Sequence, residues 1–275
     1  MLKKVAKKIV FSSLSQDRIV RFSNILNRYK SNRRHALKAS APNPQAELLF
    51  KDGIIVIENF LSAEKCEYYK KRILDFSSQY SQSINLPNGT KIMYRSGDHG
   101  GDAGMIDIKH IDRSIPELSA IIEEGEQFIP SMNYAARTDF AFISLNAYVN
   151  SGIKHTRDFH IDDISPITYK AFIYLTDVDD ESYGPYTFIK GSQRFNPQIY
   201  ISLFRNVFNS KSEWGEIAYY NKHKMWKVLG KKGTLILSDQ SGIHRGLPQQ
   251  EGKVRVALVL NYIEKDYLTI VSQKD

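Results

Sequence analysis

The chain has 275 residues, enough for one or two domains, and 42% of them are apolar, which is enough to bury a substantial core. No apolar run approaches the ~18 residues that span a bilayer, and the lone cysteine, Cys66, excludes a disulfide framework. The net charge of +8 is uneven, because residues 1–46 hold eleven basic residues against one acid, Asp17. That segment carries +10 and the rest about −2. We therefore expect a cytoplasmic globular protein with a basic arm.

The basic arm, residues 1–46, is predicted to be helical. Ser15 is a suitable N-cap, and the apolar residues after it recur at helical spacing: Ile19, Phe22, Leu26 and Tyr29. A basic amphipathic helix can lie on an anionic membrane surface or bind an acidic partner, and its composition also resembles an organelle transit peptide. The alternative is a helix that packs on the main domain. Residues 39–45, with two prolines, are expected to form the linker.

The main domain is expected at residues 47–275, with helices first and strands afterwards. Its first half is predicted to contain a strand at 53–57 and helices at 63–76 and 116–128, with Cys66 as a buried filler of the first helix. Short strands are then predicted at 140–149, 159–162, 169–175, 186–189, 234–237 and 254–262. This order fits helices packed on paired antiparallel sheets, and a jelly-roll barrel is one way for such strands to avoid free edges.

One segment carries a pair of metal-binding side chains. Residues i and i+2 of an extended strand point to the same side, so His160 and Asp162 can bind one metal ion together. A second imidazole, that of His244, would complete a set of two histidines and one carboxylate. Three protein ligands leave open positions on the metal, which is typical of non-haem Fe(II) enzymes that use oxygen.

A second His-x-Asp pair competes with the first. His110 and Asp112 precede Arg113 and a helix-like run, so Asp112 is expected to begin a helix or to form an ion pair, and we prefer His160 and Asp162. The other histidines carry weaker interpretations as loop, solvated or substrate-contacting residues: His35, His99, His155 and His223.

Arg255 lies eleven residues past His244, on the last predicted strand. Alternation along that strand places Arg255 on one face with Ala257 and Val259. An arginine among such residues is costly to bury unless it is paired, and a bound carboxylate would pair it through two parallel hydrogen bonds. The alternative is an arginine at a strand end that reaches solvent or an acidic neighbour.

At these residues the chain resembles the phytanoyl-CoA dioxygenase-like family of Fe(II)/2-oxoglutarate oxygenases. Residues 184–192 resemble the family's turn between core strands, residues 233–239 the strand that delivers the distal histidine, and residues 53–62 its opening strand and helix start. The similarity keeps the same order from about residue 50 to residue 262.

Three positions depart from the family pattern. Lys190 and Gln193 replace the usual proline and histidine of the turn, neither of which is expected to touch metal. Gly246 stands where some relatives have a serine that helps to bind the co-substrate.

The resemblance implies a mainly β fold with flanking helices (α+β), a double-stranded β-helix of the jelly-roll or cupin type with N-terminal helices. It implies Fe(II) bound by His160, Asp162 and His244, 2-oxoglutarate with its far carboxylate on Arg255, and O2 as the oxidant. The expected reaction is hydroxylation of an aliphatic carbon with release of succinate and CO2. Related halogenases have a small residue in place of Asp162, so halogenation is not expected.

The substrate is less defined than the reaction. Residues 194–228 are aromatic and basic and are expected to form a lid, which suits a small-molecule, lipid, sugar or carrier-linked substrate. A surface helix with a packed aromatic face is the alternative. No specific nucleic-acid binding is expected. Two other functions remain open: a catalytically idle jelly-roll binding or scaffold protein, and a Zn-dependent hydrolase that uses the same ligands but has no need of Arg255.

Overall fold

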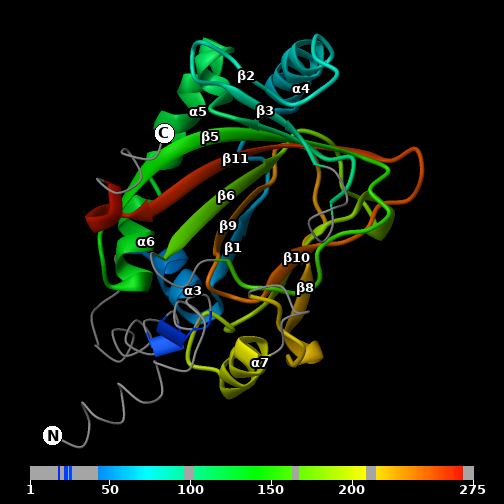
Figure 1. Ribbon diagram of the computed structural model, residues 1–275. Helices are drawn as coiled ribbons and strands as arrows, with labels where there is room; N and C mark the ends of the chain where they lie inside the picture. Colours follow the sequence, from blue (N-terminus) through cyan, green and yellow to red (C-terminus); the bar gives the residue numbers. More distant parts are fainter. Residues whose placement is uncertain are drawn as a thin grey trace, which may run out of the picture.

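The computed structural model describes residues 18, 22–23, 25–26, 43–95, 102–162, 167–208 and 215–268, and its centre is a pair of antiparallel sheets that face each other (Figure 1). The larger sheet has the order β1-β9-β6-β11-β5-β4-β3-β2, and the smaller has the order β10-β7-β8. The larger sheet contains β1 (Ile54–Ile57), β2 (Ile84–Asn85), β3 (Lys91–Tyr94), β4 (Ile106–Lys109), β5 (Phe140–Ser151), β6 (Thr168–Tyr174), β9 (Leu235–Asp239) and β11 (Val254–Glu264). The smaller sheet contains β7 (Tyr186–Ile189), β8 (Met225–Lys227) and β10 (His244–Gly246). The fold is thus mainly β and of the jelly-roll type, as expected, although the described strands do not close into one hydrogen-bonded barrel.

Strand β11 separates the two parts of the core. Leu258 and Leu260 face the helices and belong to the main hydrophobic cluster, whereas Ala257 faces the space between the two sheets. Strand β5 pairs with β11 from Val254↔Ser151 to Glu264↔Phe140, with a bulge between Asn261 and Tyr262. The alternation predicted for the last strand is therefore confirmed, and it turns Arg255 toward the space between the sheets.

Most helices cover one face of the larger sheet (Figure 1). The α-helices are α3 (Pro44–Asp52), α4 (Ala63–Ser77), α5 (Ser119–Glu126), α6 (Ile129–Ala136) and α7 (Pro197–Phe208). The short 3-10 helices are η2 (Ile111–Arg113), η3 (Pro116–Leu118), η4 (Glu181–Tyr183), η5 (Lys222–Lys224) and η6 (Lys265–Tyr267). A Cβ on Gly125 of α5 would lie 2.5 Å from Tyr262 Oη and 2.7 Å from Leu260 Cδ2, so α5 approaches β11 too closely for any side chain there.

The first strand and the long helix after it lie where the sequence predicted them, at Ile54–Ile57 and Ala63–Ser77. The expected linker at 39–45 is partly wrong, because its last residues begin a helix. The Asn43 side chain accepts a hydrogen bond of 2.7 Å from the backbone N–H of Ala46 and so caps α3. The domain boundary expected after residue 46 falls inside this helix.

The single helix predicted at 116–128 is wrong, because the structure divides this segment. Helix α5 ends at Glu126 and α6 begins at Ile129, with η3 ahead of both. Pro130 has no backbone N–H and fits only the first turn of a helix, so the helix must restart there.

The segment expected to be a lid, residues 194–228, contains a packed helix and a core strand in its described part. Helix α7 buries Ile199, Leu203 and Val207 against the outer side of the smaller sheet. Strand β8 belongs to that sheet, with Lys190 Nζ 4.0 Å above the ring of Trp226. The packed face matches the alternative interpretation, and a lid function stays a prediction.

The basic arm is described at only five residues, all helical: Arg18, Phe22, Ser23, Ile25 and Leu26. Ile25 is 3% exposed and packs in the cluster of α7, and the rings of Phe22 and Phe204 meet edge to face at 5.9 Å. The predicted cap, Ser15, lies outside the described residues. Nothing among the described helices is both long enough and apolar enough to cross a membrane.

Candidate metal centre

His160 and His244 come together because their backbones pair. His244 is the first residue of β10, and His160 forms an isolated antiparallel bridge with it through hydrogen bonds of 3.0 Å and 2.8 Å. A second bridge joins His160 to Glu216. The prediction of a continuous strand at 159–162 is therefore wrong, because this segment forms only isolated bridges at His160.

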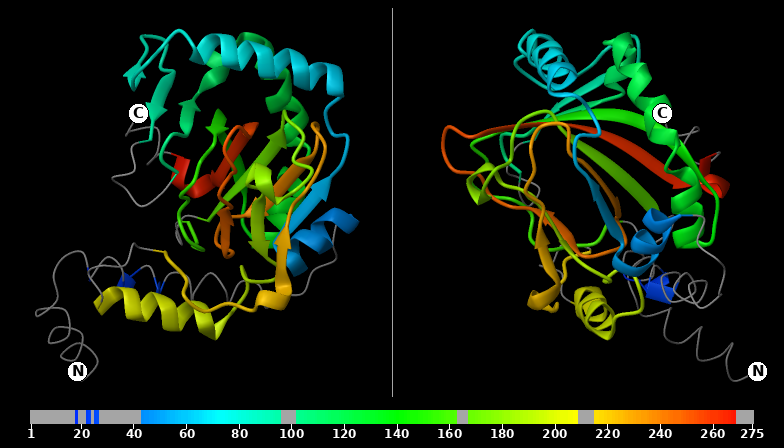
Figure 2. Two further views of the ribbon diagram at one scale, coloured as in Figure 1. Left: turned by 90° about the vertical axis from the view of Figure 1, so that its right-hand side faces the viewer. Right: turned by 180° about the vertical axis from the view of Figure 1, so that it is seen from behind.

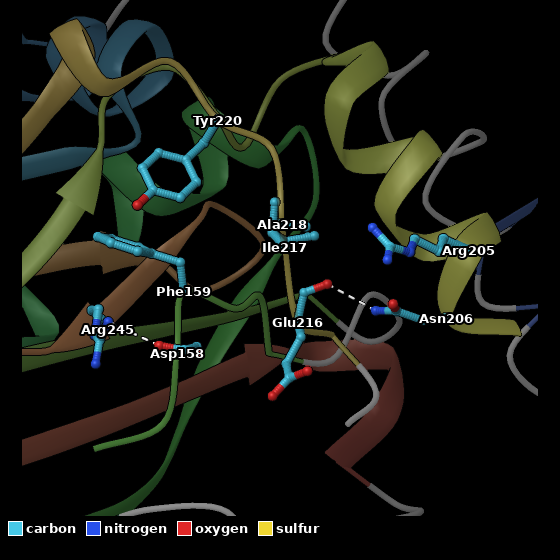
Figure 3. Close-up of a pocket in the computed structure, with 9 residues that line it drawn as sticks. All are labelled: Asp158, Phe159, Arg205, Asn206, Glu216, Ile217, Ala218, Tyr220 and Arg245. Carbon is cyan, nitrogen blue, oxygen red and sulfur yellow. Dashed lines mark hydrogen bonds and ion pairs between the residues drawn. The ribbon is translucent and has the colours of Figure 1, made fainter. Parts of the chain in front are cut away.

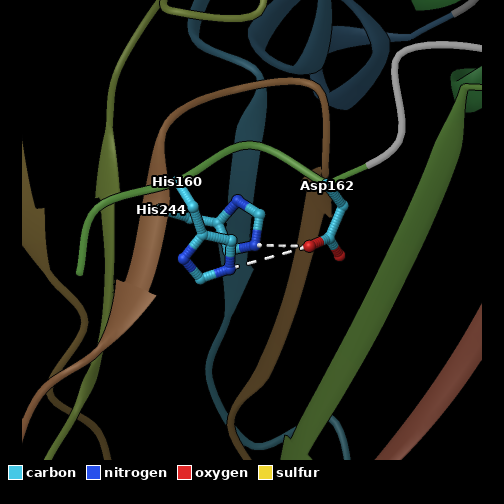
Figure 4. A group of neighbouring side chains, drawn as sticks. All are labelled: His160, Asp162 and His244. Atoms are coloured by element: carbon cyan, nitrogen blue, oxygen red, sulfur yellow. Dashed lines mark ion pairs between the residues drawn. The ribbon is translucent and has the colours of Figure 1, made fainter. Parts of the chain in front are cut away.

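The three predicted ligands surround one point (Figure 4). Their ligand atoms all lie within 4.8 Å of one another, with Asp162 Oδ1 3.6 Å from His160 Nε2 and 3.8 Å from His244 Nε2. Within the described ranges, this is the one group of three or more His, Cys, Asp or Glu side chains that could hold a metal ion.

Both imidazoles are held in the tautomer that a metal requires. His160 Nδ1 lies 2.7 Å from the carbonyl of Asp158, and His244 Nδ1 lies 2.9 Å from the carbonyl of Gly242. A carbonyl can only accept, so each Nδ1 carries the proton and each Nε2 presents its lone pair to the shared point. Such a second partner fixes the orientation of metal-binding histidines.

The charges of the site also suit a cation. Burial lowers the pKa of His160 from 6.5 to about 2 and lowers that of His244, so both rings stay neutral at physiological pH. Burial is the largest single influence on Asp162 and opposes its ionisation, but the ammonium of Lys170, its hydrogen bond and the two imidazoles together lower the pKa of that carboxyl. The site therefore offers two neutral nitrogens and one carboxylate.

Lys170 is a site residue that the sequence analysis missed. Its Nζ donates a hydrogen bond of 2.6 Å to Asp162 Oδ2, the oxygen that does not face the histidines. Burial opposes its charge, but Asp162 raises the pKa of Lys170 above its usual value. A signal was present, because Lys170 shares its face of β6 with Phe172 and Tyr174, which point between the sheets.

Arg255 lines the same cavity as the three ligands. This cavity, of about 260 Å³, is called the metal cavity below; it is lined by His160, Asp162, His244, Lys170 and Arg255 together with side chains of β5 and of the loops after β3 and β5. The guanidinium is buried, which lowers the pKa of Arg255, and its hydrogen-bond partner is Tyr174. Arg255 is half-buried as a residue, its Nη1 has no exposed surface, and the acidic side chain of Asp102 lines the same cavity.

Buried polar atoms of the metal cavity that lack a hydrogen-bond partner among the described residues include Asn150 Oδ1, Gln240 Oε1 and Arg255 Nη1. Buried polar atoms without partners are rare in folded proteins, so a cluster of them around one cavity indicates a polar ligand. The free guanidinium nitrogen of Arg255 specifically suits a carboxylate. The donor set and these atoms together fit a metal ion with a carboxylate co-substrate.

Gly246, which stands where some relatives have a co-substrate-binding serine, lies beside Arg255. A Cβ on Gly246 would lie 3.6 Å from Arg255 Nη2, an ordinary contact distance. A serine there would reach the guanidinium without a clash, so glycine at this position removes a hydroxyl from the carboxylate end of the cavity.

The other candidates lie elsewhere. His110 precedes η2 with φ of 53°, and neither His110 nor Asp112 lines the metal cavity. His155 and His223 are exposed, and neither lines the cavity. His35 and His99 fall outside the described residues.

A second cavity, of about 390 Å³, is lined by residues next to the metal-binding histidines in the chain (Figure 3). Phe159 and Arg245, the chain neighbours of His160 and His244, line it instead of the metal cavity. Arg245 Nη1 bonds Asp158 Oδ1 at 3.1 Å, and Asn206 of α7 donates to the carbonyl of Glu216 at 2.8 Å. Arg205 and Asn206 of α7 also line this cavity, so it lies between part of α7 and the segments that carry the metal-binding residues.

Comparison with known proteins agrees with this geometry. The family model of phytanoyl-CoA dioxygenase (PhyH) matches residues 49–257. No curated protein matches the chain in sequence.

Solved structures with the same fold include three enzymes of low sequence identity. EvdO2 from Micromonospora carbonacea var. aurantiaca, complexed with 2-oxoglutarate, is 11% identical over 83% of this chain and 93% of its own, with a TM-score of 0.59. HygX from Streptomyces hygroscopicus, with nickel and 2-oxoglutarate, is 9% identical over 82% and 88%, with a TM-score of 0.55. The epimerase SnoN, in complex with Fe3+, alpha ketoglutarate and nogalamycin RO, is 13% identical over 80% and 82%, with a TM-score of 0.55.

Proposed function

Because the chain belongs to the phytanoyl-CoA dioxygenase family, it is an Fe(II)- and 2-oxoglutarate-dependent enzyme, and we propose that it hydroxylates an aliphatic carbon of a small polar substrate. The observation that carries the proposal is the metal cavity, in which three metal-binding side chains and a buried arginine with a free nitrogen share one space.

The side chains have separate tasks in this reaction. His160, Asp162 and His244 would hold the metal through Nε2, Oδ1 and Nε2. Arg255 binds the far carboxylate of 2-oxoglutarate and so orients the co-substrate. When bound, Fe(II) and 2-oxoglutarate supply the oxidising chemistry with O2 and release succinate and CO2.

The lining of the metal cavity supports a polar substrate. Beyond the proposed metal and co-substrate ligands, it offers charged groups such as Arg95, Asp102 and Arg157, whereas Met105 and Phe172 are its apolar side chains. A long acyl chain needs a mostly apolar pocket to repay its desolvation. Among the substrate classes expected from the sequence, a sugar or another small polar molecule therefore fits better than a lipid.

Two other outcomes of the same chemistry must be separated from hydroxylation. SnoN, which shares the fold, is an epimerase, so an enzyme of this architecture can return a product of unchanged mass. Related halogenases have a small residue in place of Asp162, so the carboxylate at this position favours hydroxylation over halogenation.

An uncoupled-turnover assay tests the proposal. Protein loaded with Fe(II) without oxygen is given 2-oxoglutarate and then O2, and succinate is measured. The expected result is O2-dependent succinate that requires Fe(II), is absent with Zn(II), and is absent in Asp162→Ala. A screen of polar metabolites should then find a substrate that raises the succinate rate and gains one oxygen atom. Turnover with a product of unchanged mass would show that the reaction is an epimerisation and not a hydroxylation. Full activity with Zn(II) would show that the protein is not an oxygenase.

A further inference from the structure

Helix α7 has apolar side chains on two opposite sides. One side, with Ile199, Leu203 and Val207, is buried against the smaller sheet. The other exposes Ile201 by 58%, Phe204 by 42% and Phe208 by 65%. Positions i, i+3 and i+7 of a helix form one stripe, so these three side chains make a continuous apolar line along the outside of the helix.

The basic arm adds apolar side chains beside this line. Phe22 of the arm contacts Phe204 edge to face at 5.9 Å, and Leu26, one helical turn after Phe22, is 43% exposed. We name Leu26, Ile201, Phe204 and Phe208 the α7 face. In Figure 2 the helix lies at the periphery of the molecule, beside the described residues of the arm. Single exposed apolar residues are common, but a contiguous group marks a surface that binds something.

Charge identifies the kind of partner. Residues 1–46, whose described part lies against α7, carry +10 by sequence, and α7 itself contains Arg205 and no acidic residue. A second copy of the chain carries the same net charge of +8 and would be repelled. An anionic lipid surface instead attracts the basic residues and accepts aromatic and aliphatic side chains between its head groups.

We propose that the α7 face and the basic arm together bind an anionic membrane surface, so that the enzyme is peripheral to a membrane. The apolar side chains enter the interface and the arm supplies the electrostatic attraction. The metal cavity takes no part in this contact, and the inference is independent of the substrate.

Vesicle flotation tests the proposal. Full-length protein is mixed with phosphatidylcholine vesicles, with or without phosphatidylserine, at low and high salt. We expect flotation with phosphatidylserine that weakens at high salt, because screening shortens the range of exposed charges. The triple variant Ile201→Ser, Phe204→Ser, Phe208→Ser should bind these vesicles about tenfold or more weakly, because it cannot bury the apolar stripe.

A matched variant controls for general surface hydrophobicity. Ile84 and Met93 are 39% and 38% exposed on β2 and β3, away from α7, so Ile84→Ser with Met93→Ser should bind vesicles as the wild type does. Circular dichroism and uncoupled turnover should show that each variant is folded. The proposal is overturned if the wild type binds neither vesicle, or if the triple variant binds as the wild type does. It is equally overturned if the wild type is a dimer that the triple variant makes monomeric and no vesicle is bound.

Discussion

Lys170 Nζ lies 2.6 Å from Asp162 Oδ2, while Asp162 Oδ1 faces the two imidazoles at 3.6 Å and 3.8 Å. The two oxygens of one carboxylate therefore have different partners. Lys170 balances the charge of Asp162 through Oδ2, which leaves Oδ1 free to bind a metal ion. A carboxylate held in this way would offer a metal ion one oxygen, Oδ1, because Oδ2 is already bonded to Lys170.

Replacement of Lys170 by methionine should destabilise the metal-free protein. Asp162 would be left in the cavity without its cation, and losing one partner of a buried ion pair costs ~3–5 kcal/mol. Both side chains keep about a fifth of their surface exposed, 23% and 22%, so we expect a smaller loss of about 2–3 kcal/mol in the free energy of unfolding. Urea unfolding with a chelator measures it.

A conservative control accompanies this variant. Lys170→Arg keeps the charge and should lose less stability than Lys170→Met. Addition of a divalent cation such as Co(II) should restore part of the stability of Lys170→Met, because the metal supplies the missing positive charge. Equal stability of wild type and Lys170→Met without metal would show that the ion pair contributes nothing.

Removal of any metal ligand should abolish turnover. His160→Ala, Asp162→Ala and His244→Ala each take one of three donors from the site, so Fe(II) binding weakens and succinate formation stops. His110→Ala is the control, because His110 lies outside the metal cavity. Equilibrium dialysis with Fe(II) measures the affinity directly. Loss of activity in His110→Ala, with His160→Ala fully active, would mean that the other His-x-Asp pair holds the metal.

The sequence identified most of this site because its residues obey simple spacing. His160 and Asp162 are two residues apart, and Arg255 follows the alternation of a strand that is confirmed over its length. Lys170 was missed because a lysine at alternate positions of a strand normally faces water. Its alternation with Phe172 and Tyr174 was a signal that this face is covered, but only the fold shows that the side chain reaches Asp162.

The fold was predictable where elements are long and periodic. Strand β11 and helix α4 were located to within a few residues. The segment around His160 was not located correctly. His160 pairs through single bridges with Glu216 and His244, which are distant in the chain, and such bridges leave no local sequence pattern. The helix break before Pro130 was readable from the residue type and was overlooked.

Arg255→Ala should raise the requirement for 2-oxoglutarate. The guanidinium is buried beside the metal site with a free Nη1, so its loss leaves the far carboxylate of the co-substrate without a partner. A cost of ~3–5 kcal/mol corresponds to a rise in the apparent KM of at least about a hundredfold. Fe(II) affinity should change little, because Arg255 is not among the metal ligands. An unchanged KM would place the carboxylate elsewhere in the cavity.

Cys66 should be unreactive in the folded protein. It lies in α4 with no exposed surface, and burial raises its pKa from 9.0 to about 11. At pH 8 about one thiol in a thousand would be ionised, against about one in ten after unfolding, and only the thiolate attacks an alkylating agent. The rate of labelling with a thiol reagent should therefore be low in buffer and rise by orders of magnitude in urea. Rapid labelling of the native protein would contradict the buried position.

The basic arm should contribute to stability through Ile25 rather than through its charge. Ile25 is 3% exposed in a cluster with Phe159, Ile199 and Leu203, so Ile25→Ala should lower the free energy of unfolding by ~2–5 kcal/mol.

Deletion of residues 1–17 leaves this contact in place and should change stability little. Deletion of residues 1–42 removes Ile25 but keeps Asn43 as the cap of α3, so the protein should unfold at lower urea yet retain Fe(II)- and 2-oxoglutarate-dependent turnover. Urea midpoints and succinate rates of the three proteins measure both effects. If the 1–42 deletion unfolds at the same urea concentration as the full chain, the packing of the arm on α7 does not stabilise the fold; if it loses turnover while still folded, the arm takes part in the active site.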